Sequence, residues 1–155
     1  MEIERKFLIK EIPFSLNSYK ARKIEQAYLC TEPVVRVRCD NDDYYLTYKS
    51  AGFVAREEYN LPLTAEGYYH LLAKADGNII TKTRYEIPEA NGLIIELDVF
   101  EGRFQGLILA EVEFKSIEQA MSYNPPKWFG EDVSNDTNYH NSTMSRLPET
   151  VINFV

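Results

Sequence analysis

Pairs of like charges, spaced two residues apart, recur along this sequence and are its main candidates for chemistry. The carboxylate pairs are Glu2/Glu4, Glu96/Asp98 and Glu111/Glu113, and the cation pairs are Arg36/Arg38 and Lys82/Arg84. Side chains two apart in a strand project from the same face, at a separation of roughly 6–7 Å. Such pairs repel mildly, so we expect each to face a ligand of opposite charge. An anion with several oxygens suits the cations, and a divalent metal suits the carboxylates.

The apolar residues between these charges predict the elements that carry them. Alternation with a period of two is typical of half-buried strands, and it indicates about eight of them. Their expected ranges are 2–9, 24–30, 34–40, 44–49, 54–61, 79–87, 93–100 and 108–115. Thr64 as N-cap predicts a helix over 64–76, and a capping box at Ser116 opens a short second helix. A third helix is expected over 138–146, while residues 11–23 fit neither pattern.

The number of these strands favours a mainly antiparallel β fold with added helices, of the α+β class. We expect a closed eight-stranded β-barrel tunnel with helices packed outside, formed by a single domain over residues 1–155. The apolar register is then needed outside, against the helices, so the charged register must face the lumen. Charges in a lumen need partners of opposite sign. A metal-bound polyphosphate provides both kinds of partner.

Composition and net charge argue against several other classes of protein. The net charge of −7 and the pI near 4.9 disfavour a binder of nucleic-acid duplexes or anionic membranes. No apolar run approaches the roughly 18 residues of a membrane span, and the acidic start lacks the features of a secretion signal. Cys30 and Cys39 are too few for a disulfide scaffold, so we expect a cytoplasmic protein. Because the sequence contains no P-loop motif, side chains must hold any phosphate.

Some of these charges also have a plainer interpretation. A sheet with one solvated face routinely carries charges of both signs. Two pairs could be ordinary cross-strand ion pairs, namely Arg56 with Glu58 and Glu86 with Lys115. Each of these strands carries a pair of charges of the same sign. This grouping weighs against a solvated face, because the repulsion within a pair brings no benefit in water.

Four further polar residues are left open between function and structure. His70 is expected at the surface of the helix over 64–76, and His140 is expected to be structural. Tyr139 and Ser142 could contact a substrate or merely cap the last helix.

Seven short motifs follow one another along the chain. They are Glu2-Ile3-Glu4-Arg5-Lys6-Phe7, Arg36-Val37-Arg38, Tyr48-Lys49, Arg56-Glu57-Glu58-Tyr59, Lys82-Thr83-Arg84-Tyr85, Glu96-Leu97-Asp98-Val99-Phe100-Glu101-Gly102 and Glu111-Val112-Glu113-Phe114. A closing motif follows in Asp132-Val133, Asp136, Tyr139, Asn141 and Ser142. This ordered set resembles the CYTH, or triphosphate tunnel metalloenzyme, superfamily over roughly residues 1–147.

The resemblance implies an eight-stranded antiparallel tunnel that binds a triphosphate together with Mg²⁺ or Mn²⁺. The expected phosphate-binding residues are Lys6, Arg36, Arg38, Lys49, Arg56, Lys82 and Arg84. The expected metal ligands are Glu2, Glu4, Glu96, Asp98, Glu111 and Glu113. Catalysis is assigned to Glu2, Glu4, Lys6, Glu111 and Glu113, which would position a water against the terminal phosphorus. Asn60 and Asn138 depart from the family's pattern, which has a carboxylate and a basic residue there.

Hydrolysis of inorganic triphosphate is the first functional expectation, because the chain is short and shows no clear nucleobase pocket. A class IV-type adenylyl cyclase or a thiamine triphosphatase is the enzymatic alternative. A non-catalytic module that binds polyphosphate or nucleotide is the alternative of another class, although three carboxylate pairs would hinder anion binding alone. A glycosidase would leave the cation pairs unexplained. The expected partner is a small anionic substrate, either triphosphate or nucleoside triphosphate, and the expected state is a monomer or homodimer.

Overall fold

An antiparallel sheet forms the body of the protein. The computed structural model describes residues 1–147, and within them the sheet has nine strands. In the order of their pairing they are β5 (Ala55–Arg56), β1 (Glu2–Leu8), β9 (Ile108–Glu113), β8 (Ile94–Glu101), β7 (Asp76–Pro88), β2 (Lys20–Thr31), β3 (Val34–Asp40), β4 (Asp43–Lys49) and β6 (Glu58–Pro62). The last eight residues of the predicted domain, 148–155, lie outside the described part.

Short helices complete the described chain. The α-helices are α1 (Ala65–Leu72), α2 (Ile117–Ser122) and α3 (Asn141–Met144), and the 3₁₀ turns are η1 (Ala90–Gly92), η2 (Gly102–Phe104) and η3 (Thr137–Tyr139). None of the helices in residues 1–147 has the length and apolar character needed to cross a membrane.

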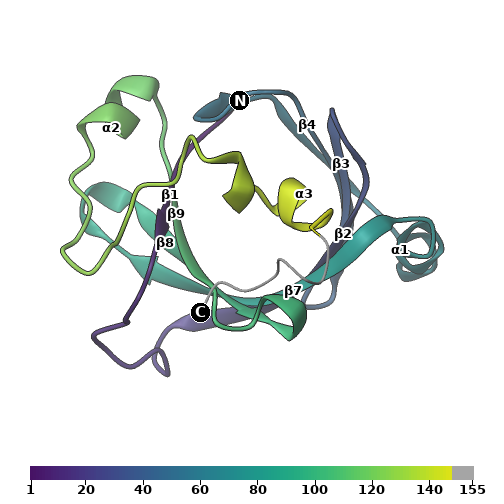
Figure 1. The fold of residues 1–155 in the computed structure, drawn as a ribbon, viewed down its shortest axis with the longest axis horizontal. Helices are drawn as coiled ribbons and strands as arrows, with labels where there is room; N and C mark the ends of the chain where they lie inside the picture. The colour runs from purple at the N-terminus through teal and green to yellow at the C-terminus, as the bar shows by residue number, and fades with distance from the viewer. Residues whose placement is uncertain (148–155) are drawn as a thin grey trace.

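The sheet curves back on itself because one segment of chain pairs with both of its ends. β5 pairs with β1, placing Arg56 opposite Glu2, and β6 pairs with β4, placing Glu58 opposite Lys49. Figure 1 looks down the ring that results. The predicted barrel is therefore confirmed as a nearly closed one. The predicted strand over 54–61 is two strands that change partners at Glu57, which is why there are nine strands rather than eight.

The outward register of the barrel is apolar and forms the larger core. β1, β8 and β9 contribute the buried residues Ile3, Ile95, Leu97, Ala110 and Val112 to this core. They pack against Ala120 of α2 and against aromatic residues of the segments 14–19 and 123–129. Each large apolar side chain buried in this way contributes roughly 1.5–3 kcal/mol. On the opposite side, α1 covers the outer face of β3 and β4 with the fully buried Tyr68.

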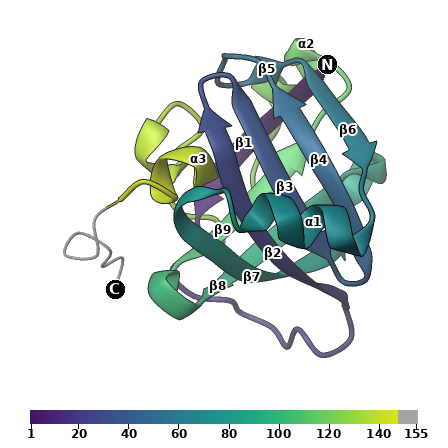
Figure 2. The same ribbon diagram turned by 90° about the vertical axis from the view of Figure 1, so that its right-hand side faces the viewer.

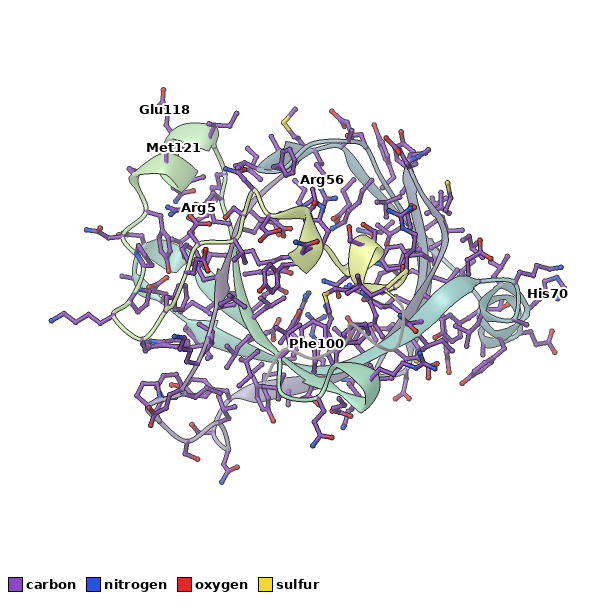
Figure 3. The ribbon with its side chains drawn as sticks, in the orientation of Figure 1. Arg5, Arg56, His70, Phe100, Glu118 and Met121 are labelled. Atoms are coloured by element: carbon purple, nitrogen blue, oxygen red, sulfur yellow. The ribbon has the colours of Figure 1, made fainter. Side chains whose placement is uncertain are left out.

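At one end of the barrel the inward register also becomes apolar. Ile80, Phe100 and Leu109 each stand two residues from a charged lumen residue, and they pack around Met144 of α3. Residues 137–145, which form η3 and α3, fill this end of the lumen and are called the plug below (Figures 1 and 2). Figure 3 shows Phe100 beneath the plug and Arg5 outside the wall. The barrel is thus a tunnel with one end filled.

Hydrogen bonds from the wall fix the plug. Asn78 donates through its backbone N–H to Ser145 O at 2.5 Å and through Nδ2 to Met144 O at 3.2 Å. The preceding segment runs beside β1, where Val133 N–H donates to Lys6 O at 2.9 Å. The helix predicted over 138–146 is shorter than expected, because His140 has an extended backbone (φ −70°, ψ 131°) that separates η3 from α3.

Two other predicted boundaries are wrong. Thr64 caps α1 as expected, accepting from Gly67 N–H at 3.0 Å, but the helix ends at Leu72 instead of continuing to Asp76. Asp76 already belongs to β7 and pairs opposite Tyr28 of β2, so sheet pairing ends the helical stretch early. β2 begins at Lys20, inside the stretch 11–23 whose structure the sequence pattern left open.

Replacing Gly77 tests how firmly the wall holds the plug. Gly77 has φ +76°, and a Cβ atom there would collide with the carbonyl oxygen of Ser145. We expect Gly77→Ala to lower the free energy of unfolding by more than about 1 kcal/mol, measured by urea denaturation. Gly92→Ala is the matched control, since Gly92 has φ +75° with no neighbouring atom within 4 Å. Equal losses in the two variants would show that the Ser145 contact adds nothing.

Candidate active site

The lumen holds a cavity of about 210 Å³ whose lining is almost entirely charged or polar. Eight Lys or Arg side chains and six Glu side chains line it. The structure brings together every predicted site residue except Asp98, namely Glu2, Glu4, Lys6, Arg36, Arg38, Lys49, Arg56, Lys82, Arg84, Glu96, Glu111 and Glu113. In Figure 3 the view runs down this lumen, and Arg56 is labelled on its wall.

Carboxylates and cations come from opposite sides of the barrel. The neighbouring strands β1, β9 and β8 supply Glu2, Glu4, Glu113, Glu111 and Glu96. The neighbouring strands β7, β2 and β3 supply Arg84, Lys82, Arg22, Arg38 and Arg36. Lys6, Lys49 and Arg56 stand beside the carboxylates of the acidic wall. A ligand in the lumen therefore meets an acidic wall on one side and a basic wall on the other.

Arg36 and Arg38 are the clearest anion-binding groups. Arg36 donates to Thr47 Oγ1 at 3.1 Å, and its Nε is buried without a partner. Arg38 donates through Nε to Gln26 Oε1 at 2.8 Å. Burial, with the neighbouring charge of Arg38, lowers the pKa of Arg36. Among the described residues both guanidinium groups have neutral partners, so a bound anion would supply the missing charge.

Asp98 orients two further cations from behind the lining. Arg84 donates to both carboxylate oxygens of Asp98, at 2.7 and 2.9 Å, and Lys82 Nζ lies 2.8 Å from Oδ2. Burial lowers the pKa of Lys82 to about 7. The charge of Asp98 acts in the opposite direction, and that of Arg84 lowers the pKa further. Asp98 is fully buried, so the structure places it with the cations and apart from the other predicted metal ligands.

The acidic wall is crowded. Glu4 stands directly opposite Glu113, and Glu96 stands directly opposite Glu111. Like charges in such positions destabilise a sheet. Burial and the neighbouring Glu4 raise the pKa of Glu2 to about 8. Burial and, to a lesser extent, the charge of Glu111 raise the pKa of Glu4. Burial and, to a lesser extent, the charge of Glu96 raise the pKa of Glu113.

Glu111 differs from the other carboxylates of this wall. Although burial favours its protonated form, Lys6 and Arg84 hold its pKa well below the usual range. Lys6 Nζ lies 3.3 Å from Oε1 of Glu111 and also donates to the carbonyl oxygen of Tyr139 at 3.1 Å. Glu111 is therefore ionised. It contacts Lys6 of the acidic wall and Arg84 of the basic wall, so it connects the two sides of the site.

The acidic wall offers the donor set that Mg²⁺ or Mn²⁺ prefers, which is oxygen only. Among the described residues, no three Asp, Glu, His or Cys side chains already surround a common point. Ion pairs hold the carboxylates instead, since Lys49 Nζ lies 3.0 Å and Arg56 Nη2 3.4 Å from Glu2 Oε1. Burial, with the neighbouring carboxylates, raises the pKa values of Glu2, Glu4 and Glu113, and a divalent cation would favour their ionised forms. The residues therefore fit such a metal.

Several lining residues were missed by the sequence analysis. Arg22, Tyr28 and Tyr45 come from strand positions that the motifs do not cover. From the plug come His140, which was expected to be structural, and Asn141, which was named in the closing motif without a role in the site. Arg22 stands in the same alternating register as the buried Ile24, so extending the predicted strand backwards would have found it. Asn141 accepts from Lys82 Nζ at 3.1 Å, which ties the plug to the basic wall.

The remaining open positions also have definite places. Within the described residues Arg56 pairs with Glu2 rather than Glu58, and Glu86 pairs with Lys20 at 3.4 Å rather than with Lys115. Asn60 lines the cavity, where it accepts from Thr47 Oγ1 at 2.6 Å. Ser142 also lines the cavity, whereas Tyr139 contributes its carbonyl oxygen to Lys6.

The sequence profile of the CYTH domain matches residues 1–150 of this chain. The chain belongs to the CYTH domain family. It is 37% identical over 147 residues to an inorganic triphosphatase of Nitrosomonas europaea, covering 93% of this chain and 96% of the relative. An inorganic triphosphatase of Acetivibrio thermocellus is 34% identical over 152 residues, covering 95% and 94%.

A solved structure supports the same relationship. The crystal structure of an inorganic triphosphatase superposes on this CYTH domain with a TM-score of 0.71 at 34% identity, covering 96% of each chain. A putative adenylyl cyclase of Hippeastrum, described as having a dominant triphosphatase activity, matches with a TM-score of 0.55 at 17% identity and shows the fold alone. The predicted family and tunnel fold are confirmed.

The protonation state of His140 can be measured directly. Burial, with the nearby charges of Lys6 and Arg56, lowers the pKa of His140 to about 4. We therefore expect its imidazole to be neutral at pH 7 and to gain a proton only near pH 4 in an NMR titration of the ligand-free protein. His70, exposed on α1, is the second histidine of the chain, and His70→Gln assigns the two signals. A midpoint near 6.5 for His140 would contradict its burial.

Proposed function

We propose that this CYTH protein is an inorganic triphosphatase, which hydrolyses triphosphate to pyrophosphate and phosphate. The observation that carries the proposal is the pair Arg36 and Arg38, two buried guanidinium groups with neutral partners that face an acidic wall across one lumen. A polyphosphate bound with a divalent metal matches both walls. The relatives named inorganic triphosphatase cover nearly the whole chain, which supports the same substrate.

The basic wall would bind and orient the phosphates. Arg36, Arg38 and Arg84 can donate paired N–H groups to phosphate oxygens, while Lys6, Lys49, Arg56 and Lys82 add charge around them. Thr47 and Asp98 fix the directions of Arg36 and Arg84 through hydrogen bonds. Pre-oriented donors of this kind stabilise charge that develops on the phosphate oxygens during transfer.

The acidic wall would hold the metal and the attacking water. Glu2, Glu4, Glu111 and Glu113, with Glu96 beside them, are the proposed ligands of Mg²⁺ or Mn²⁺. Such an ion supplies charge neutralisation and lowers the pKa of bound water. Glu111, being ionised and central, is the group best placed to accept the proton of a water aligned with the terminal phosphorus. The oxygen of that water bonds to the terminal phosphorus as the P–O bond to pyrophosphate breaks, and the neighbouring Lys82 and Arg84 neutralise the leaving oxygen.

Cavity size favours the inorganic substrate over an organic triphosphate. The volume of about 210 Å³ is below the roughly 300–1,000 Å³ of pockets that enclose drug-sized ligands. A class IV-type adenylyl cyclase or a thiamine triphosphatase would have to leave its organic group outside the cavity. A cytoplasmic location, a single domain to residue 155 and a monomeric or homodimeric state stay predictions from the sequence.

Substrate comparison tests the proposed function. With Mg²⁺ or Mn²⁺ present, we expect the purified protein to turn over inorganic triphosphate faster than ATP or thiamine triphosphate, and EDTA to abolish this activity. Phosphate, pyrophosphate and cyclic AMP are measured together. Cyclic AMP as the main product would indicate the cyclase, and binding of triphosphate without turnover of any of the three compounds would indicate the binding module.

Neutralising one central carboxylate tests the assignment of the acidic wall. We expect Glu111→Gln to lower metal-dependent turnover by at least about 100-fold, because the variant loses a metal ligand and a proton acceptor. Glu118→Gln is the control, since it removes the same charge from the exposed face of α2 (Figure 3). Thermal unfolding of each variant checks the fold. Full activity of the Glu111 variant would remove this residue from the site.

A further inference from the structure

The two ends of the cavity differ in structure. The plug fills the end at which β7 and β9 begin and β2 ends. The opposite end is formed where β2, β4 and β8 begin and where β3, β7 and β9 end. Arg22, Tyr45, Glu96 and Glu113 line the cavity towards this open end. A linear anion must therefore enter between these residues and stop at the plug.

The cations of the deep part are available to a ligand. Arg36 and Arg38 are both at least nine-tenths buried, at 6% and 7% exposure, and their partners among residues 1–147 are neutral. Lys82 also points into this region, where it contacts Asn141 of the plug at 3.1 Å, although its charge is paired with Asp98. Positive charge is thus concentrated next to the plug.

The cation at the open end is neutralised by the protein itself. Arg22 donates through Nη1 to Asp40 Oδ2 at 2.7 Å, and its Nη2 lies 3.5 Å from Glu96 Oε2. Tyr45 OH lies 3.3 Å from the same Asp40 oxygen. Asp40 is 5% exposed, so its charge acts on Arg22 with little screening by water. The Nε atom of Arg22 is buried without a partner in the described structure.

Further carboxylates lie at the same end of the barrel as this arginine. Asp42 and Asp43 are exposed where β3 ends and β4 begins, close in the chain to Asp40. A phosphate placed at the open end would therefore meet negative charge, whereas one placed beside Arg36 and Arg38 meets positive charge.

We propose that Arg22 and Asp40 form a collar that limits the chain length of the substrate. A triphosphate occupies the deep, cationic part of the tunnel, and the fourth phosphate of a longer chain would have to lie at the collar. There Asp40 already occupies the guanidinium group of Arg22 and repels the additional phosphate. This inference rests on the proposed triphosphatase function and adds a selection against longer linear polyphosphates.

The ratio of kcat/KM for inorganic tetraphosphate to that for inorganic triphosphate measures this selection. Asp40→Asn removes a repelling charge and frees Arg22 for a fourth phosphate. We expect it to raise the ratio about tenfold, the effect of one charge-assisted hydrogen bond. Arg22→Gln leaves Asp40 unneutralised and is expected to lower the ratio. The two substitutions therefore have opposite effects, which general damage to the fold would not produce.

A charge change elsewhere provides the control. Glu101→Gln removes a carboxylate that pairs with Lys23 at 2.9 Å on the outward face of the sheet, with 42% of its side chain exposed. It should leave the ratio unchanged. Thermal unfolding of all variants identifies any that fails to fold. If the Asp40 variant fails to fold, the Arg22 variant still tests the collar.

Each outcome separates the collar from the proposed function. A wild-type protein that does not hydrolyse triphosphate refutes the proposed function. A wild-type protein that hydrolyses tetraphosphate as well as triphosphate refutes the collar and leaves the function intact. The collar is also refuted if Asp40→Asn matches the Glu101 control or if Arg22→Gln raises the ratio.

Discussion

The need to compensate charge inside a closed lumen governs this structure. Once the apolar register of a barrel packs outwards, the charged register has no access to bulk water on most of its length, and uncompensated charge there is costly. The protein meets part of this cost internally, as where Asp98 binds Arg84 and Lys82 in one buried cluster. It leaves another part open at Arg36 and Arg38. The uncompensated part is what selects a ligand.

The same constraint explains why the charges are sorted by strand. If acidic and basic residues alternated around the ring, each could pair with its neighbour, and the lumen would have little affinity for an ion. Sorting places carboxylates opposite carboxylates, as with Glu4 and Glu113, and the neighbouring Glu2 keeps a raised pKa even though Lys49 is close by. Stability is exchanged for affinity at these positions, which is common where a sheet carries a binding site.

Much of the site could be predicted from the sequence because alternation in a strand fixes which residues share a face. Glu2, Arg36 and Glu111 were placed in one lumen on that basis, and the structure brings them together. Asp98 obeys the same register, but its burial behind Arg84 depends on hydrogen bonds across strands that periodicity does not encode. Neither the plug nor the splitting of the strand over 54–61 has a periodic signal, since both depend on contacts between distant segments.

Element boundaries failed for a related reason. Thr64 signals a helix start through a local hydrogen bond, and that start is where the sequence placed it. The end of the helix is set by the pairing of Asp76 with Tyr28, which lies far away in sequence. The start of the helix could be predicted because it depends on a local hydrogen bond. The end of the helix could not, because it depends on pairing with a distant strand.

The position of β1 has a consequence for how the chain can fold. β1, at Glu2–Leu8, pairs with β9 at residues 108–113 and with the segment that contains Asp132, both far along the chain. During synthesis β1 emerges long before β9, and in the meantime the only strand of the described sheet that is both made and able to pair with it is the two-residue β5. Such separation in sequence slows folding and leaves an unpaired edge exposed meanwhile. The charges of Glu2, Glu4 and Lys6, which serve the finished tunnel, would also keep this waiting strand soluble.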